Sequence, residues 1–161
     1  MSRLREYGRN FFESLGYEPK KNRADIEASA IPSLDKEIQN LEERKNKLKI
    51  DSLSQEIRQA KDKRMEESIR LIGSLKERRK NKEQNLDFQI QELEGILSNR
   101  KKELNLLLSE ANKSLKDLES GGKVAGNTEA MNQKQKEIDK YITDINRIEQ
   151  ILSSQPETKA A

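Results

Sequence analysis

The chain has 161 residues, of which 38% are charged and only 32% are apolar, whereas globular domains have roughly 25% charged and 45–50% apolar residues. Its 32 Lys and Arg residues are interleaved with 29 Asp and Glu residues, a pattern typical of solvated helix faces. Without cysteine or histidine, the chain cannot form disulfides, and zinc and most transition-metal sites are effectively excluded. We therefore predict an all-α protein with a narrow apolar seam and no cofactor.

Residues 1–16 are predicted to form a short amphipathic helix, because apolar side chains recur there at helical spacing and Gly16 is suited to end it. Four of the six aromatic residues of the chain lie between Tyr7 and Tyr17. Aromatic side chains concentrate binding energy because they bury large, rigid areas. The predicted partner-binding anchor consists of Leu4, Tyr7, Phe11, Phe12, Leu15 and Tyr17.

Two other roles for this anchor helix remain open from the sequence. Its apolar side chains could fold back and cap the oligomer of the chain itself. Alternatively, the helix could lie on a membrane surface, which its three arginines favour and its two glutamates oppose.

A polar linker is predicted at 17–32, with room for one or two helical turns after Asn22. A long helix is predicted over 33–119, since Pro32 suits a first helical turn and no proline follows within that range. Its apolar residues fit coiled-coil heptads, with register changes that we interpret as local skips. The predicted oligomer seam contains Ile38, Leu41, Ile57, Met65, Ile69, Ile72, Leu86, Ile90, Leu93, Leu97, Leu104 and Leu107.

The glycine-rich segment 120–127 is the strongest break, and a second helix is predicted over 128–153, followed by a disordered tail at 154–161. The second helix matches the end of the first in length, which favours an elongated coiled coil with a C-terminal antiparallel hairpin. A flexible break in a parallel rod is the alternative. In the hairpin, Arg100 would lie close enough to pair with Glu149; the alternative is that Arg100 is a solvated interruption of the seam.

The returning helix is too short to cover the seam of residues 33–85. Because an isolated amphipathic helix gains most of its stability from packing, a second chain is expected to cover it. The sequence thus predicts a homo-oligomer, a dimer or a trimer.

A basic segment at 76–82 is the main electrostatic feature. Clustered cations of this kind can bind nucleic acid, or they can extend from the seam into solvent. The possible nucleic-acid contacts are Lys76, Arg78, Arg79, Lys80 and Lys82.

The function predicted from these features is non-enzymatic. We expect an oligomeric rod, spacer or fibre that is anchored through its N-terminal aromatic helix to a larger protein assembly, for example part of a virion. The alternative is an assembly scaffold or a nucleic-acid-associated factor that uses the basic segment. No apolar run approaches the 20 or so residues of a membrane span, and no secretion signal is seen, so a cytoplasmic or virion location is expected.

Overall fold

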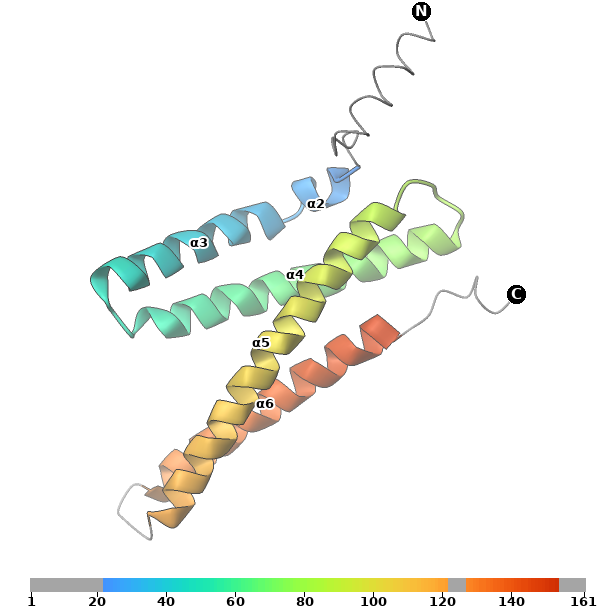
Figure 1. Ribbon diagram of the computed structural model, residues 1–161. Helices are drawn as coiled ribbons and strands as arrows, with labels where there is room; N and C mark the ends of the chain where they lie inside the picture. Colours follow the sequence, from blue (N-terminus) through green and yellow to red (C-terminus); the bar gives the residue numbers. More distant parts are fainter. Residues whose placement is uncertain (1–21, 122–126, 154–161) are drawn as a thin grey trace, which may run out of the picture.

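The computed structural model describes residues 22–121 and 127–153, and this part of the chain is all helical (Figure 1). Its helices are α2 (Ala24–Ala28), α3 (Ile31–Leu48), α4 (Leu53–Lys80), α5 (Asp87–Ser120) and α6 (Asn127–Ser153). The predicted all-α fold is confirmed. The predicted anchor helix at 1–16, with Leu4, Tyr7, Phe11, Phe12, Leu15 and Tyr17, lies outside the described residues, as does the tail at 154–161.

The prediction of one helix over 33–119 is wrong, because the chain turns twice within that range, at 49–52 and at 81–86. Both turns use residues with positive φ, namely Lys49 (51°), Lys82 (65°) and Asn85 (67°). A left-handed residue after a helix is a common way to end it, although glycine usually occupies that position. The chain therefore folds back on itself where a continuous rod was expected.

The predicted linker contains one ordered element, the single-turn helix α2. Helix α3 then begins at Ile31 with Pro32 in its first turn, which is close to the predicted start. At the other end, α5 stops at Ser120 and α6 starts at Asn127, on either side of the predicted glycine-rich turn.

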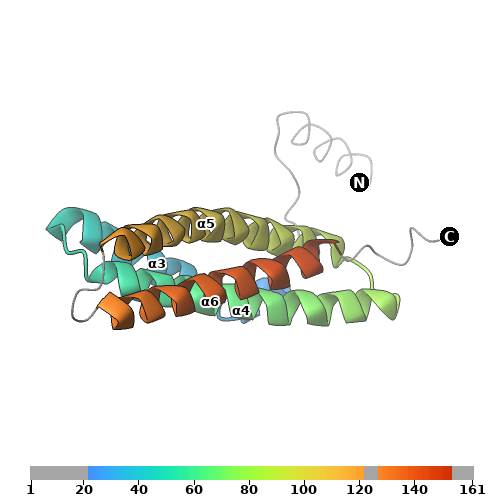
Figure 2. The ribbon, with the colours of Figure 1, turned by 90° about the horizontal axis from the view of Figure 1, so that it is seen from below.

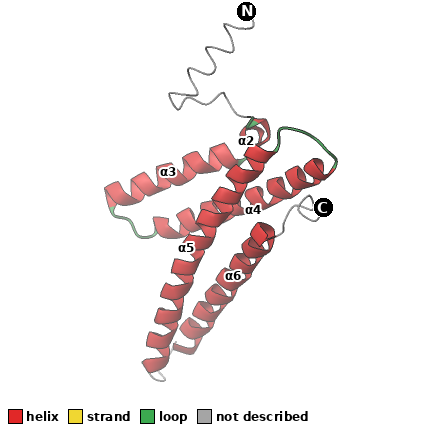
Figure 3. Cartoon of the chain, turned by 45° about the vertical axis from the view of Figure 1, so that its right-hand side comes forward, coloured by secondary structure: helices red, strands yellow, loops and turns green. Residues whose placement is uncertain are grey.

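The four long helices form two antiparallel pairs that cross each other (Figures 1 and 3). Helix α3 packs on α4, α4 packs on α5, and α5 packs on α6. Figure 2 shows α6 next to α5, an arrangement that is compatible with the predicted hairpin. Helices α4 and α6 do not pack closely, and neither do α3 and α5. Two open grooves are lined by residues of both α4 and α5.

Two hydrophobic clusters hold this arrangement together. The larger one joins α2 and the start of α3, at Ile31, to α4, α5 and α6, and the smaller one joins α3 to the first part of α4. Burial of apolar area contributes roughly 25 cal/mol per Å², so these clusters are the main source of stability. The smaller cluster consists of Ile38, Leu41, Leu53, Ile57 and Ala60.

The predicted seam is buried within one chain, so the premise that residues 33–85 need a second chain is wrong. Helix α3 covers one side of α4, and α5 covers another. Ile69 and Leu107 are partly buried against the larger cluster. The remaining seam residues are buried: Ile38, Leu41, Ile57, Met65, Ile72, Leu86, Ile90, Leu93, Leu97 and Leu104.

Candidate functional site

Helix α2 is fixed to the body by a buried glutamine. Gln89 is fully buried, and its Oε1 accepts hydrogen bonds from the backbone N–H groups of Asp25 (3.0 Å) and Ile26 (3.2 Å). These N–H groups belong to the first turn of a helix, where no intrahelical acceptor is available. The Gln89 Nε2 donates to Asp25 Oδ2 at 2.9 Å. One amide thus satisfies both the backbone and the carboxylate of α2.

Ion pairs and apolar packing strengthen this attachment. Arg23 forms a two-point pair with Glu92, with both N–O distances at 2.9 Å. Ile26 and Ile31 are 0% and 1% exposed. Arg78 Nη1 lies 2.7 Å from Asp25 Oδ1, and this hydrogen bond, followed by that from Gln89, lowers the pKa of Asp25. Short as it is, α2 is therefore an integral part of the body.

The basic segment at 76–82 closes the turn between α4 and α5. Arg78 binds Glu83 as well as Asp25, and Arg79 Nη1 lies 3.4 Å from Asp87 Oδ1. The hydrogen bonds that Arg78 donates to Glu83 and Asp25 raise its pKa. The sequence did not indicate this structural role.

Lys76 of the same segment donates to the backbone oxygen of Ile151 at 3.0 Å, and Lys80 also has an interaction. Lys82 lies in the turn itself. Binding of nucleic acid by this segment stays a prediction, but most of its cations already contribute to the fold.

A ladder of three ion pairs connects α4 to α6. Its rungs are Arg58–Glu137 (3.2 Å), Asp62–Lys140 (2.5 Å) and Glu66–Arg147 (2.6 Å). The three α4 residues are four positions apart, so they lie along one face of the helix. Because α4 and α6 do not pack closely, long polar side chains span the space between them.

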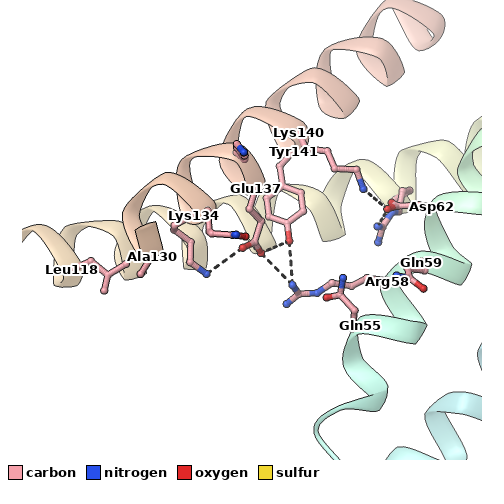
Figure 4. A pocket seen from close by; sticks show the side chains of 13 residues that line it. Gln55, Arg58, Gln59, Asp62, Leu118, Ala130, Lys134, Glu137, Lys140 and Tyr141 are labelled. Atoms are coloured by element: carbon pink, nitrogen blue, oxygen red, sulfur yellow. Dashed lines mark hydrogen bonds and ion pairs between the residues drawn. The ribbon is translucent and has the colours of Figure 1, made fainter. Parts of the chain in front are cut away.

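The first rung contains a tyrosine as well (Figure 4). The Tyr141 hydroxyl donates to Glu137 Oε1 at 2.7 Å and accepts a hydrogen bond from Arg58 Nη1 at 3.2 Å. Burial, together with the hydrogen bond to Glu137, raises the pKa of Tyr141 to about 12. The tyrosine therefore stays neutral and serves as a fixed donor at neutral pH.

Beside this ladder lies an open groove of about 680 Å³, which we call the α4–α6 groove. Its α4 wall carries Arg58 and its floor is α5, while α6 supplies most of the other wall. Lys134 from that wall points toward Glu137 and lies 3.2 Å from it (Figure 4). The volume falls within the roughly 300–1,000 Å³ of ligand-binding clefts.

A smaller groove of about 360 Å³ lies on the other side of α4, and we call it the α3–α5 groove. Ile57, Leu106 and Leu107 give it apolar surface, and Lys61 spans it to reach Glu103 at 2.7 Å. Leu106 is 68% exposed.

Arg100 lies where α4 and α5 cross and borders both grooves. It is only 5% exposed, and its Nη2 lies 2.8 Å from Asp62 Oδ1. The predicted pair between Arg100 and Glu149 is wrong, because Glu149 pairs with Lys101 at 3.4 Å. Arg100 pairs instead with Asp62, because the crossing places α4 over this face of α5. The predicted straight rod did not contain this contact.

Asp144 is a buried carboxylate beside the ladder. It is 6% exposed, and among the described residues no hydrogen-bond donor reaches its Oδ2. Burial is the main cause that raises its pKa, and the neighbouring carboxylates of Asp62 and Glu66 act in the same direction. Lys140 and Arg147 act against them, the latter with its Nη1 3.7 Å from Asp144 Oδ1.

We expect Asp144→Asn to raise the melting temperature at pH 7. A carboxylate whose pKa is raised on folding contributes stability that is present below the ordinary value of 3.8 and is lost as pH rises through the folded value. The stabilising effect of the substitution should therefore shrink toward zero below pH 3.8. Thermal melts across pH, with exposed Asp139→Asn as a control of the same charge change, test this. An equal gain at all pH values would contradict it.

Sequence reasoning missed Arg58, Asp62 and Glu66, although their four-residue spacing was visible as one charged stripe. It also missed Gln89, for which no local signal exists, because a glutamine within a helix is ordinary. Tyr141, within the predicted last helix, is 5% exposed.

No helix in the ranges 22–121 and 127–153 is long and apolar enough to cross a membrane. Within the same ranges, no group of three or more acidic residues could hold a metal ion. No family model, curated protein or solved structure matches the chain.

Proposed function

We propose that the protein is a non-enzymatic structural component that joins a larger protein assembly through its N-terminal aromatic segment, Tyr7 to Tyr17. In this proposal the two helical pairs form a rigid body that extends from the attachment point. The observation that supports it best is the attachment of α2 to the body by Gln89, Arg23 and Arg78.

The covalent distance from the aromatic segment to α2 supports this proposal. Five peptide steps join Tyr17 to Asn22, and at about 3.3–3.6 Å each they reach at most about 18 Å. Asn22 is itself held by a hydrogen bond from its Nδ2 to the backbone oxygen of Asn85 (3.3 Å). Whatever Tyr17 contacts must therefore lie close to the turn between α4 and α5, whereas Phe11 and Phe12 can reach further.

The chemistry of the grooves favours a binding role over catalysis. A general acid and base need environments that move their pKa values apart toward neutrality. Here Arg58, Asp62 and Lys140 are instead matched in ion pairs within open grooves. Such pairs position helices.

The double variant Phe11→Ala, Phe12→Ala tests the proposed attachment. We expect it to keep the melting temperature and solution mass of the wild type. Its affinity for the assembly should fall about 30-fold or more, because hot-spot truncation costs about 2 kcal/mol. The assay is recovery of assembly proteins on the tagged full-length chain from its native source.

A second variant separates attachment from rigidity. Gln89→Ala should speed amide exchange at Asp25 and Ile26, since it removes their acceptor, and should leave recovery of the assembly unchanged. Exposed Gln91→Ala is its matched control. If the double phenylalanine variant lowers the melting temperature instead, the aromatic residues cap the protein's own body and the proposal is wrong.

A further inference from the structure

We propose that the α4–α6 groove is a docking site for an amphipathic helix of another protein, and that the polar face of this helix is acidic. This goes beyond the proposed function, because it gives the body a second attachment site, distinct from the N-terminal segment.

The length and position of the groove suit a helix. Its α5 lining comes from Arg100 and Leu118, which are 18 positions apart and, at 1.5 Å per residue, about 27 Å or five helical turns apart along the helix. Toward Leu118 the α5 and α6 pair extends past α4 as two helices alone (Figures 1 and 3). Two helices bury their apolar faces incompletely, and Leu115 and Leu118 are only half-buried. A further helix in the groove would complete a bundle there.

The groove has both apolar and polar lining, as helix-binding grooves do. Apolar surface comes from Leu118, Ala130 and Tyr141. Amide groups come from Gln55, Gln59 and Gln133, and they can hydrogen-bond to either an anionic or a cationic partner group. Tyr141, the only aromatic residue that lines it, is 5% exposed. It cannot stack on a base, and such stacking is the usual basis for binding single-stranded nucleic acid.

The charge of the lining selects an acidic partner. Five cations and two carboxylates line the groove, which leaves a net charge of +3. Lys136 is exposed on the α6 wall, with Lys134 two positions before it and Lys140 about one turn after it. Carboxylates on an incoming helix could take over Lys140, which Asp62 now holds, because the lysine side chain is 58% exposed and such surface pairs exchange at little cost.

The terminal segments of the chain do not have this charge. Residues 1–21 contain five basic and three acidic side chains, so their net charge of +2 is repelled by the groove. Residues 154–161 contain one of each sign. The occupant is therefore assigned to a different protein.

The experiment uses fluorescence anisotropy with the full-length protein and a labelled helical peptide of about 20 residues, long enough to fill the groove. The peptide carries leucine along one face and glutamate with alanine elsewhere. A peptide with lysine in place of glutamate, and a sequence-scrambled acidic peptide, serve as controls for charge and amphipathicity. We expect binding of the acidic amphipathic peptide only, weakened by added salt.

Two charge-reversal variants locate the binding. Lys134→Glu with Lys136→Glu should weaken binding about tenfold, because rim charges steer and orient the partner. Lys102→Glu with Lys113→Glu, on exposed positions of α5 outside the groove lining, makes the same change in net charge and should have no effect. If the first variant folds poorly, Lys136→Glu alone replaces it, since Lys136 is exposed.

Four results would overturn the proposal. They are failure of the acidic amphipathic peptide to bind, equal binding of the scrambled peptide, equal weakening by both double variants, and binding of a 20-nucleotide single-stranded DNA when the peptide does not bind. Self-association that disappears in the Lys134→Glu, Lys136→Glu variant would assign the groove to a second copy instead. Since the Phe11→Ala, Phe12→Ala variant does not alter the groove, the two proposals can fail independently.

Discussion

Replacing Leu97 by alanine should lower the free energy of unfolding by about 2–5 kcal/mol. Leu97 is fully buried in α5, within the larger hydrophobic cluster. Removing its isobutyl group loses the transfer free energy of those atoms and leaves a cavity that four helices cannot easily fill. Urea titrations followed by circular dichroism measure the change.

Leu106→Ala is the matched control, because it is the same substitution in the same helix at a position that is 68% exposed. Surface substitutions usually change stability by no more than about 0.5 kcal/mol. A large loss for Leu106→Ala that grows with protein concentration would mean that a second chain covers this face. The predicted homo-oligomer would then have a new physical basis, in place of the seam that the fold buries.

Asp62→Ala should lower the free energy of unfolding by about 3 kcal/mol. The substitution removes the main partner of Arg100, whose side chain is 6% exposed, and an uncompensated buried charge costs about 3–5 kcal/mol. The value should be near the lower end, since Glu103 stays 3.4 Å from Arg100 Nη1. Lys140 also loses its partner, but its side chain is 58% exposed and regains water. Thermal and urea unfolding test this.

Glu66→Ala provides the comparison, one helical turn further along α4. It breaks the exposed pair with Arg147, where the side chains are 53% and 40% exposed, and such pairs contribute about 0–1 kcal/mol. Equal losses for the two alanine variants would show that burial of Arg100 is not what makes Asp62 important. Asp62→Leu with Arg100→Met, which removes both charges, should restore most of the lost stability.

The helical class of the protein could be predicted from composition, and most of the buried residues from periodicity. Leu93, Leu97 and Leu104 were assigned to an apolar seam and are fully buried. Periodicity shows which face of a helix is buried, but it does not show what covers that face. The covering helix was assumed to belong to another chain, whereas α3, α4 and α5 cover one another.

The two missed turns explain that error. Glycine and proline are the usual signals of a helix end, and neither occurs at 49–52 or 81–86. The register change near residue 50 was interpreted as a skip in a coiled coil, yet it marks the point where Lys49 turns the chain. Asp51 and Ser52 before α4, and Asn85 before α5, were the available signals, because such residues favour helix starts and left-handed backbone.

The candidate grooves could not be predicted, because they depend on how the two helical pairs cross. The contacts that define them join Arg58 to Glu137, 79 positions away in the sequence, and Lys61 to Glu103, 42 positions away. The charged stripe on α4 was visible, but its partner on α6 was not.

The turn-linked pairing of the helices also bears on how quickly the protein folds. Helices α3 with α4, and α5 with α6, meet through short connections, so each pair closes with contacts between residues near in sequence. Chains dominated by such local contacts typically fold in microseconds to milliseconds. The hydrogen bonds between α2 and Gln89, and those between α6 and α4, join residues 63 to 81 positions apart. Their loop-closure entropy must be overcome before they contribute, so these bonds are the ones most expected to form late.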